Sequence, residues 1–340
     1  MKQEFEIIYN VSRISRKAWA DFVLGHPSGN VFQTPEMYDL YKLTPHHRPF
    51  VVAAVSKDSE ALVGIVLADI VYNGPSLFIP LTARSIIIGG PLVAENDDKE
   101  NILEQLVSAY VKRVPRYVVY SEIRPVYDIK PYSSVLIHTG FEFEGHYNLT
   151  LDLRPGKDQL WLDLHKERRR NIGQAMSKGL QFREIFREEE IRELIGLIQK
   201  TYHRKRVPLA DIRLFQHART SLGKECAFFS AYYDGKMIAG QVRLCYKDLV
   251  YAWFAGSDEE YFKLRPNDFL MWNVICWAFD NGYESFDFGG GGEPGIPYGV
   301  RDYKLKYGCR MDDFGRYKYL HRVVLYRLGK FGVKVLKLKK

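Results

Sequence analysis

The sequence predicts an α/β (α+β) fold made of two similar units, each a mixed sheet with flanking helices. The order of the elements indicates this repeat. In the first half, three strand-like runs are followed by an amphipathic helix over 98–112 and a strand over 117–123. In the second half, strand-like runs over 227–254 precede a helix over 267–281 and a strand over 285–288. A helix between two strands allows parallel pairing, whereas hairpin-linked strands are antiparallel, so both sheets should be mixed.

The composition favours a folded protein of about two domains that binds anionic partners. The chain has 340 residues, of which 46% are hydrophobic, and its 49 basic and 41 acidic side chains give a net charge of +8. Such an excess favours phosphates, RNA or a lipid surface. The cysteines are far apart and form no CxxC pair, which argues against a zinc site or a disulfide framework. They are Cys226, Cys245, Cys276 and Cys309. We find no apolar leader and no apolar run of about 18 residues, and expect a cytoplasmic location.

Local signals define the elements of the first half. Ser15 should cap a helix that reaches Leu24, and Thr34 should cap another helix with Pro35 at its first position. Alternating apolar residues indicate the strands. The expected strands span 5–9, 50–55, 62–71, 85–88, 117–123 and 147–153, and the further helices span 98–112 and 133–138.

The second half should begin with one long basic helix. It is expected to run from Trp161 to Gly179, with a cationic face that either contacts phosphate or is simply solvated. The following helices are expected over 188–203, 210–221 and 267–281, the last capped by Asn267, and the strands over 227–233, 237–246, 249–254 and 285–288. The first of these helices ends in the basic cluster His203-Arg204-Lys205-Arg206.

Four consecutive glycines follow the last predicted strand. Gly289 to Gly292 come directly after Phe286-Asp287-Phe288, and we expect them to form a loop that allows a ligand to approach the backbone closely. The alternative is a loop without function. A phosphate-binding P-loop is excluded because no Lys-Ser or Lys-Thr pair follows these glycines. Beyond them, cations alternate with aromatics over 303–308, which suits an anionic or carbonyl-bearing substrate.

Several motifs together resemble the FemABX family of non-ribosomal peptidyltransferases, which have the GNAT acyltransferase fold. The motifs are Val31-Phe32-Gln33-Thr34-Pro35, the basic stretch 166–179, Tyr251-Ala252-Trp253-Phe254-Ala255-Gly256-Ser257, Phe286-Asp287-Phe288-Gly289-Gly290 and Tyr303-Lys304-Leu305-Lys306-Tyr307-Gly308. The resemblance spans essentially the whole chain. It implies two tandem GNAT-like domains, 1–153 and 154–322, with a substrate cleft between them, and leaves a basic amphipathic tail over 323–340.

The resemblance also implies a reaction. Members of the family move an amino acid from aminoacyl-tRNA to an amine of a peptidoglycan precursor, with no cofactor and no metal. Lys304 matches the family lysine at the reacting centre, where an ammonium group would stabilise an oxyanion. The residues expected to bind substrate are Lys42, Arg204, Arg206, Tyr251, Phe254, Gly289, Gly290 and Tyr303. Val207 and Asp211 stand where relatives that bind a nucleotide-linked precursor have Arg and Tyr, so the acceptor is open.

Two other functions remain open at this stage. One is an acyl-CoA-dependent N-acyltransferase acting on an amino sugar of a surface polysaccharide, and the other is a GNAT-shaped binding protein without catalysis. The loop over 256–267 carries three adjacent acids, which oppose a CoA pyrophosphate at the next helix, while Lys263 and Arg265 favour it. The tail over 323–340 is either a contact with the inner membrane surface or a solvated terminus. We expect a monomer, and no general base can be assigned.

Overall fold

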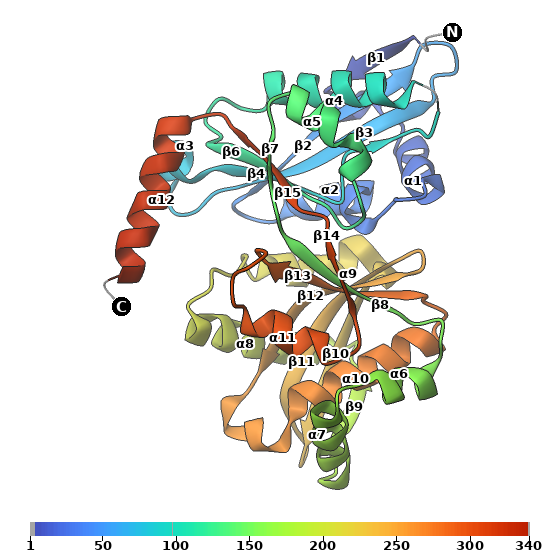
Figure 1. The fold of residues 1–340 in the computed structure, drawn as a ribbon, viewed down its shortest axis with the longest axis vertical. Helices are drawn as coiled ribbons and strands as arrows, with labels where there is room; N and C mark the ends of the chain where they lie inside the picture. The colour runs from blue at the N-terminus through green and yellow to red at the C-terminus, as the bar shows by residue number, and fades with distance from the viewer. Residues whose placement is uncertain (1–3, 97, 339–340) are drawn as a thin grey trace. The chain divides into compact units, whose positions relative to one another are not determined.

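The computed structural model of the protein describes residues 4–96 and 98–338, and for Ser76 and 332–338 it describes the backbone alone. The chain divides into two compact units (Figure 1). The first unit is Met1–Gly145 together with Phe314–Lys340, and the second unit is His146–Asp313. Each unit contains one mixed sheet, which confirms the predicted fold class.

The first unit has an eight-stranded sheet in the order β1-β2-β3-β4-β6-β15-β7, with β5 paired to β3. Its strands are β1 (Phe5–Ile8), β2 (His47–Ser56), β3 (Leu62–Val71), β4 (Arg84–Ile88), β5 (Leu92–Val93), β6 (Tyr120–Arg124), β7 (Glu142–Glu144) and β15 (Arg316–Leu320). Its helices are α1 (Arg16–Gly25), α2 (Pro35–Leu43), α3 (Ile79–Thr82), α4 (Lys99–Arg113), α5 (Ser133–His138) and α12 (Val323–Leu338). Helices α4 and α5 lie on one face of the sheet and α1 and α2 on the other (Figure 1).

The second unit has a seven-stranded sheet in the order β14-β8-β13-β12-β11-β10-β9. Its strands are β8 (Tyr147–Asp152), β9 (Gln181–Glu184), β10 (Cys226–Tyr233), β11 (Lys236–Tyr246), β12 (Leu249–Ser257), β13 (Ser285–Gly292) and β14 (Arg310–Asp313). Its helices are α6 (Lys157–Asp163), α7 (Lys166–Ser177), α8 (Glu188–Lys205), α9 (Arg213–Leu222), α10 (Pro266–Asp280) and α11 (Gly299–Leu305). Helix α10 packs on one face, together with α7, while α8 covers the other face along β12 and β11.

The predicted repeat is present in both sheets. In the first unit, β2, β3 and β4 pair antiparallel, and β4 pairs parallel with β6 after the crossover helix α4. In the second unit, β10, β11 and β12 pair antiparallel, and β12 pairs parallel with β13 after α10. The helix caps expected at Ser15 and Thr34 are confirmed, because each side chain accepts a hydrogen bond from the first turn of its helix.

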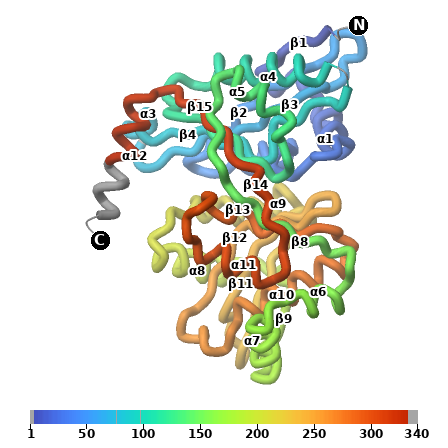
Figure 2. Tube along the Cα trace, viewed as in Figure 1, coloured from blue at the N-terminus to red at the C-terminus, as the bar shows by residue number. Residues whose placement is uncertain are grey.

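The chain passes between the units twice, and Figure 2 traces both connections. Strand β8 pairs with β13 and β14, whereas β15 returns to the first sheet between β6 and β7. The charges on β15 match its neighbours, since Lys318 Nζ lies 2.5 Å from a carboxylate oxygen of Glu144 and Arg316 lies 3.2 Å from Glu122. Because β8 belongs to the second unit and β15 to the first, the observed division differs from the expected domains 1–153, 154–322 and 323–340.

Three local predictions were wrong. The helix expected from Trp161 to Gly179 is broken into α6 and α7, because the His165 side chain caps α7 and its backbone N–H donates to the Lys306 carbonyl. Asn267 is not the cap of α10, since Pro266 already occupies the first helical position. The four glycines are not a loop but the end of β13. The strands β5, β7, β9, β14 and β15 were not predicted.

Candidate active site

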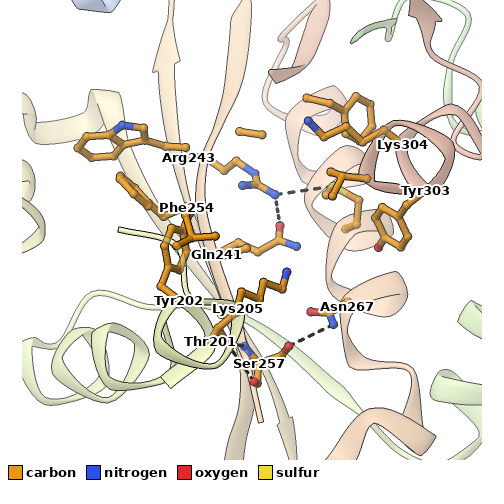
Figure 3. A pocket seen from close by; sticks show the side chains of 18 of the residues that line it. Thr201, Tyr202, Lys205, Gln241, Arg243, Phe254, Ser257, Asn267, Tyr303 and Lys304 are labelled. Atoms are coloured by element: carbon orange, nitrogen blue, oxygen red, sulfur yellow. Dashed lines mark hydrogen bonds between the residues drawn. The ribbon is translucent and has the colours of Figure 1, made fainter. Parts of the chain in front are cut away.

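The two parallel strands of the second unit separate at the point where the cavity of this site begins. Strand β12 pairs with β13 only from Leu249 to Tyr251, opposite Ser285 to Asp287. Beyond these pairs the strands diverge, and a cavity of about 600 Å³ lies among the end of α8, β11, β12, the start of α10, and α11. Figure 3 shows Phe254 and Tyr202 on one side of this cavity and Tyr303 and Lys304 on the other. A site at the carboxyl ends of parallel strands is common in α/β proteins.

A β-bulge shapes the wall made by β12. Val242 pairs with Phe254, but the next residue on β11, Arg243, pairs with Ala252, so Trp253 is an extra residue in β12. Because of the bulge, two consecutive aromatic side chains, Trp253 and Phe254, both line the cavity. Phe215 packs beneath them, with its ring centroid 4.7 Å from that of Phe254. The result is a continuous aromatic wall.

Lys304 lies on α11 and points toward this cavity (Figure 3). Its Nζ donates a hydrogen bond to the carbonyl oxygen of Gly290 at 2.8 Å. Burial lowers the pKa of Lys304 from 10.5 to about 8, although the nearby Asp287 carboxylate acts in the opposite direction. The amine is therefore still mostly protonated at neutral pH. The bond to Gly290 uses one of its three N–H hydrogens, which leaves two for a ligand.

Asp287 is fully buried beneath the glycine segment. Its Oδ1 accepts a hydrogen bond from the Gly289 N–H at 2.6 Å, and its Oδ2 has no partner among the described residues. Burial raises the pKa of this carboxyl group to about 6, while the Gly289 N–H and Lys304 lower it. At neutral pH, Asp287 thus carries the negative charge that faces the Lys304 ammonium.

The glycines are required by packing as well as by conformation. Gly289 has φ +74°, in the left-handed region. A Cβ at Gly291 would lie 2.4 Å from the Leu149 side chain and 3.0 Å from that of Tyr147 on β8. The glycine run therefore lets β13 continue close against β8 while its Gly290 carbonyl faces the lysine.

A buried polar network holds α11 in place. The Arg168 guanidinium on α7 donates to the Asp268 carboxylate on α10 and lies over the Tyr303 ring, 4.6 Å from its centroid. The Tyr307 hydroxyl donates to the same carboxylate at 3.1 Å and lies 2.9 Å from the Tyr303 hydroxyl. Asn171 donates to the other carboxylate oxygen at 2.7 Å. These contacts fix the helix on which Lys304 lies.

The lining of the cavity is cationic. Lys205, Arg243 and Lys304 line it, and no aspartate or glutamate does so within the described part of the chain. Gln241, Asn267 and Ser257 supply neutral polar groups. The arrangement suits a substrate that has both an anionic group and an apolar part.

Some of the predicted residues meet at this cavity. Lys304, Tyr303 and Phe254 line it. Gly290 supplies the carbonyl that binds the lysine, and Gly289 holds Asp287. Tyr251, in contrast, pairs with Asp287 along the sheet and does not line the cavity.

Arg204 and Arg206, both predicted to bind substrate, do not line the cavity. Arg204 pairs with Glu259 at 3.4 Å, and Arg206 is an exposed residue with φ +53° at the end of α8. Lys205, between them, lines the cavity instead. Lys42 is exposed on α2 of the first unit, and its approach to Lys304 stays a prediction.

Sequence analysis also missed Arg243 and Gln241. A period-two signal could have found them, because these two polar residues lie two positions apart in a strand that is otherwise apolar from Met237 to Cys245.

Within the described part of the chain, every helix is too short or too polar to span a membrane. Within the same residues, no cluster of His, Cys, Asp and Glu side chains could hold a metal ion.

Comparison with known proteins identifies the fold. Residues 165–305 match the family model described as an acetyltransferase (GNAT) domain. A crystal structure of FemX matches with a TM-score of 0.73 and 16% identity, over 95% of this chain and 99% of that chain. The structure of L-PGS from Bacillus licheniformis matches with a TM-score of 0.59 and 15% identity, over 93% of this chain and 96% of that chain.

A tandem GNAT protein from the clavulanic acid biosynthesis pathway gives a TM-score of 0.57 at 10% identity, over 94% of this chain and 99% of that one. A search of curated protein sequences found no match. These similarities confirm the predicted architecture of two GNAT-like units, one of which carries the matched acyltransferase domain.

Proposed function

We propose that this protein, a tandem GNAT-fold acyltransferase, moves an amino acid from aminoacyl-tRNA to an amine of a peptidoglycan precursor or a related cell-envelope acceptor. The observation that carries the proposal is Lys304, which lines the cavity at the separated strands and donates to the Gly290 carbonyl. The similarity in fold to FemX and to L-PGS supports transfer of an aminoacyl group.

In this reaction the acceptor nitrogen attacks the carbonyl carbon of the aminoacyl ester. The carbonyl oxygen becomes negative in the tetrahedral intermediate, and the Lys304 ammonium stabilises it with the hydrogens that the Gly290 bond leaves available. The C–O bond of the ester then breaks, and the released tRNA hydroxyl takes up the proton that the nitrogen loses. The Asp287 carboxylate keeps the ammonium charged during these steps.

The start of α10 favours a donor other than CoA. Pro266 at the first helical position lacks an N–H group. A CoA pyrophosphate bound at a helix start needs free backbone N–H groups and no opposing charge. Asp258, Glu259 and Glu260 add three acids to the loop that precedes this helix.

An acyl-CoA-dependent N-acyltransferase of an amino sugar is the second candidate, and the match to an acetyltransferase domain model favours it. A binding protein without catalysis is the third candidate. Thermal stability of the purified protein separates the first two, because charged tRNA should raise the melting temperature whereas acetyl-CoA should not. The opposite pattern would replace the aminoacyl donor by an acyl-CoA.

Catalysis itself is tested by single-turnover transfer of a labelled amino acid from tRNA to a precursor that bears a free amine. The Lys304→Met variant should lose about 100-fold in rate while it still binds charged tRNA, as expected for loss of an oxyanion donor. A variant that binds and transfers like the wild type would leave only the binding protein.

A further inference from the structure

Arg243 is a buried cation without a carboxylate partner. Arg243 lines the cavity and is 1% exposed. Its two terminal nitrogens donate to the backbone carbonyl of Val242, at 3.2 Å, to the side-chain oxygen of Gln241 and to the Met271 sulfur, at 3.7 Å, and its Nε–H has no partner among the described residues. The guanidinium carbon also lies 5.4 Å from the centroid of the Phe286 ring. All these partners are neutral. Burial accordingly lowers the pKa of Arg243 to about 9.

The protein treats a comparable arginine differently. Arg168, which is 6% exposed, pairs with Asp268, and Asn171 and Tyr307 complete the hydrogen bonds of that carboxylate. A buried charge without a counter-charge is costly, and proteins generally provide one. A ligand that enters the cavity is the remaining source of a counter-charge for Arg243.

Gln241 adds a second donor beside the guanidinium. It lies two residues before Arg243 on β11, so both side chains point to the same face of the strand. Since Gln241 Oε1 accepts from Arg243, its amide nitrogen is turned away from the guanidinium and makes no hydrogen bond with another described residue. Figure 3 shows both side chains at the cavity, joined by this bond.

We propose that Arg243 and Gln241 form a subsite for a carboxylate on the transferred acyl group. The inference rests on the proposed acyl transfer at Lys304, which lines the same cavity, and it deepens that function by naming the substrate class. The preferred donor then carries an acidic aminoacyl group, aspartyl or glutamyl, whose side-chain carboxylate meets the guanidinium while its ester carbonyl meets the ammonium.

Depth favours a carboxylate over a phosphate at this position. Arg243 and Gln241 are 1% and 2% exposed, so a thin planar group at the end of a side chain reaches them more easily than a bulkier tetrahedral group does. A guanidinium matches the two oxygens of a carboxylate with parallel hydrogen bonds. Lys205 lines the same cavity from an exposed position, where a hydrated phosphate of the donor fits better.

The test compares two pairs of probes on the full chain by titration calorimetry. The first pair is adenosine with glutamyl or glutaminyl linked to its 3′ position by a stable amide, which differ in one negative charge. The wild type should bind the glutamyl probe at least about tenfold more tightly, as expected for a charge-assisted hydrogen bond in a buried site. Equal binding of the two probes by the wild type would overturn the subsite, whether or not any variant folds.

Variants assign the preference to the guanidinium. Arg243→Met should abolish the tenfold preference, and Arg310→Met, at a surface arginine paired with Asp312, should keep it. Circular dichroism checks that both variants fold, and Arg243→Lys, which keeps the charge without the planar fork, serves if the Met variant does not. A preference that persists in both Arg243 variants would overturn the assignment.

The second pair, succinyl-CoA and butyryl-CoA, distinguishes this inference from the proposed donor. If neither adenosine probe binds but succinyl-CoA binds at least about tenfold more tightly than butyryl-CoA, the carboxylate subsite stands and the tRNA donor falls. If both adenosine probes bind equally and inorganic phosphate displaces them, Arg243 is a phosphate site and the carboxylate inference falls.

Discussion

Replacing Lys304 by methionine should make the protein less active and more stable. The structure gives the reason, because the ammonium group is half-buried, donates to Gly290 and has one carboxylate, Asp287, near it. Methionine has a similar length and no charge, so the change removes the ammonium while leaving the volume nearly unchanged.

The expected gain in stability follows from the pKa of Lys304. Lowering this pKa from 10.5 to about 8 corresponds to a penalty of about 3 kcal/mol for the charged form in the folded state. Because the side chain keeps some contact with water, we reduce this penalty to about 2 kcal/mol. The lost hydrogen bond to Gly290 costs about 1 kcal/mol. Burial therefore outweighs the hydrogen bond, and the variant should be more stable by about 1 kcal/mol at pH 7.

The pH dependence gives the sign a second test. Below pH 8, Lys304 is charged in both the folded and the unfolded state, so the full penalty applies. Between about pH 8 and pH 10.5 the folded state releases the proton first, and the stability of the wild type should rise with pH relative to the variant. Urea unfolding followed by tryptophan fluorescence at pH 7, 8 and 9 measures both effects.

The transfer rate should change with pH in the opposite direction to stability, because it depends on the protonated form of Lys304. If the ammonium stabilises the oxyanion, the transfer rate of the wild type falls as pH rises through about 8. A rate that instead rises through this pH would mean that the free amine acts as a base. That outcome, or a variant that is less stable than the wild type by 1 kcal/mol or more, would refute the reasoning about this lysine.

Three further predictions concern other parts of the chain. Gly256→Ala on β12 should destabilise the protein by about 3 kcal/mol, because the new Cβ would lie 2.4 Å from the backbone nitrogen of Ile198 on α8. The control Gly196→Ala, on α8 itself, adds a Cβ that meets nothing within 4 Å and should be neutral or stabilising. Urea unfolding compares the two variants. In the wild type, stability should fall as pH rises from about 4 to 6, because the buried Asp287 carboxyl has a raised pKa and loses its proton at a higher pH in the folded state than in the unfolded state. Asp287→Asn should remove this fall, and an unchanged pH dependence would contradict the prediction. Truncation after Leu328 should lower cosedimentation with anionic phosphatidylglycerol vesicles and leave that with neutral vesicles unchanged, since the tail over 323–340 is basic and apolar; equal sedimentation would remove the membrane contact.

Local sequence signals were sufficient for most helices and strands, but not for long-range pairing. Ser15 and Thr34 mark helix starts through their own side chains, which any short window of sequence contains. The return of β15 to the first sheet depends on partners such as Glu122, which lies almost 200 residues earlier in the chain. No local pattern encodes that pairing.

The candidate site shows the same division. The resemblance pointed to Lys304 through a short, continuous motif, and this residue lines the cavity of the second unit. Its catalytic role stays a prediction. Among Arg204, Lys205 and Arg206, Lys205 lines the cavity, whereas Arg204 pairs with Glu259 and Arg206 is exposed at the end of α8, and these tertiary contacts are not visible in the sequence. Arg243 was missed because its position in an apolar strand does not by itself indicate a ligand site. It indicates one once the structure shows that the guanidinium is buried and has no carboxylate partner among the described residues.

A comparison of the two sheets explains why the cavity lies in the second unit. In the first unit, β4 pairs with β6 over all five residues, and the Gly89 N–H extends the pairing to the Arg124 carbonyl. The buried side chain of Gln33 fills the adjacent space, because its amide donates to the Leu67 and Ile88 carbonyls and accepts from the Leu67 N–H. In the second unit the strands separate after three pairs, and the corresponding space is open. The Gln33 side chain of the Phe-Gln motif therefore fills this space in one copy of the fold, whereas the other copy has the cavity.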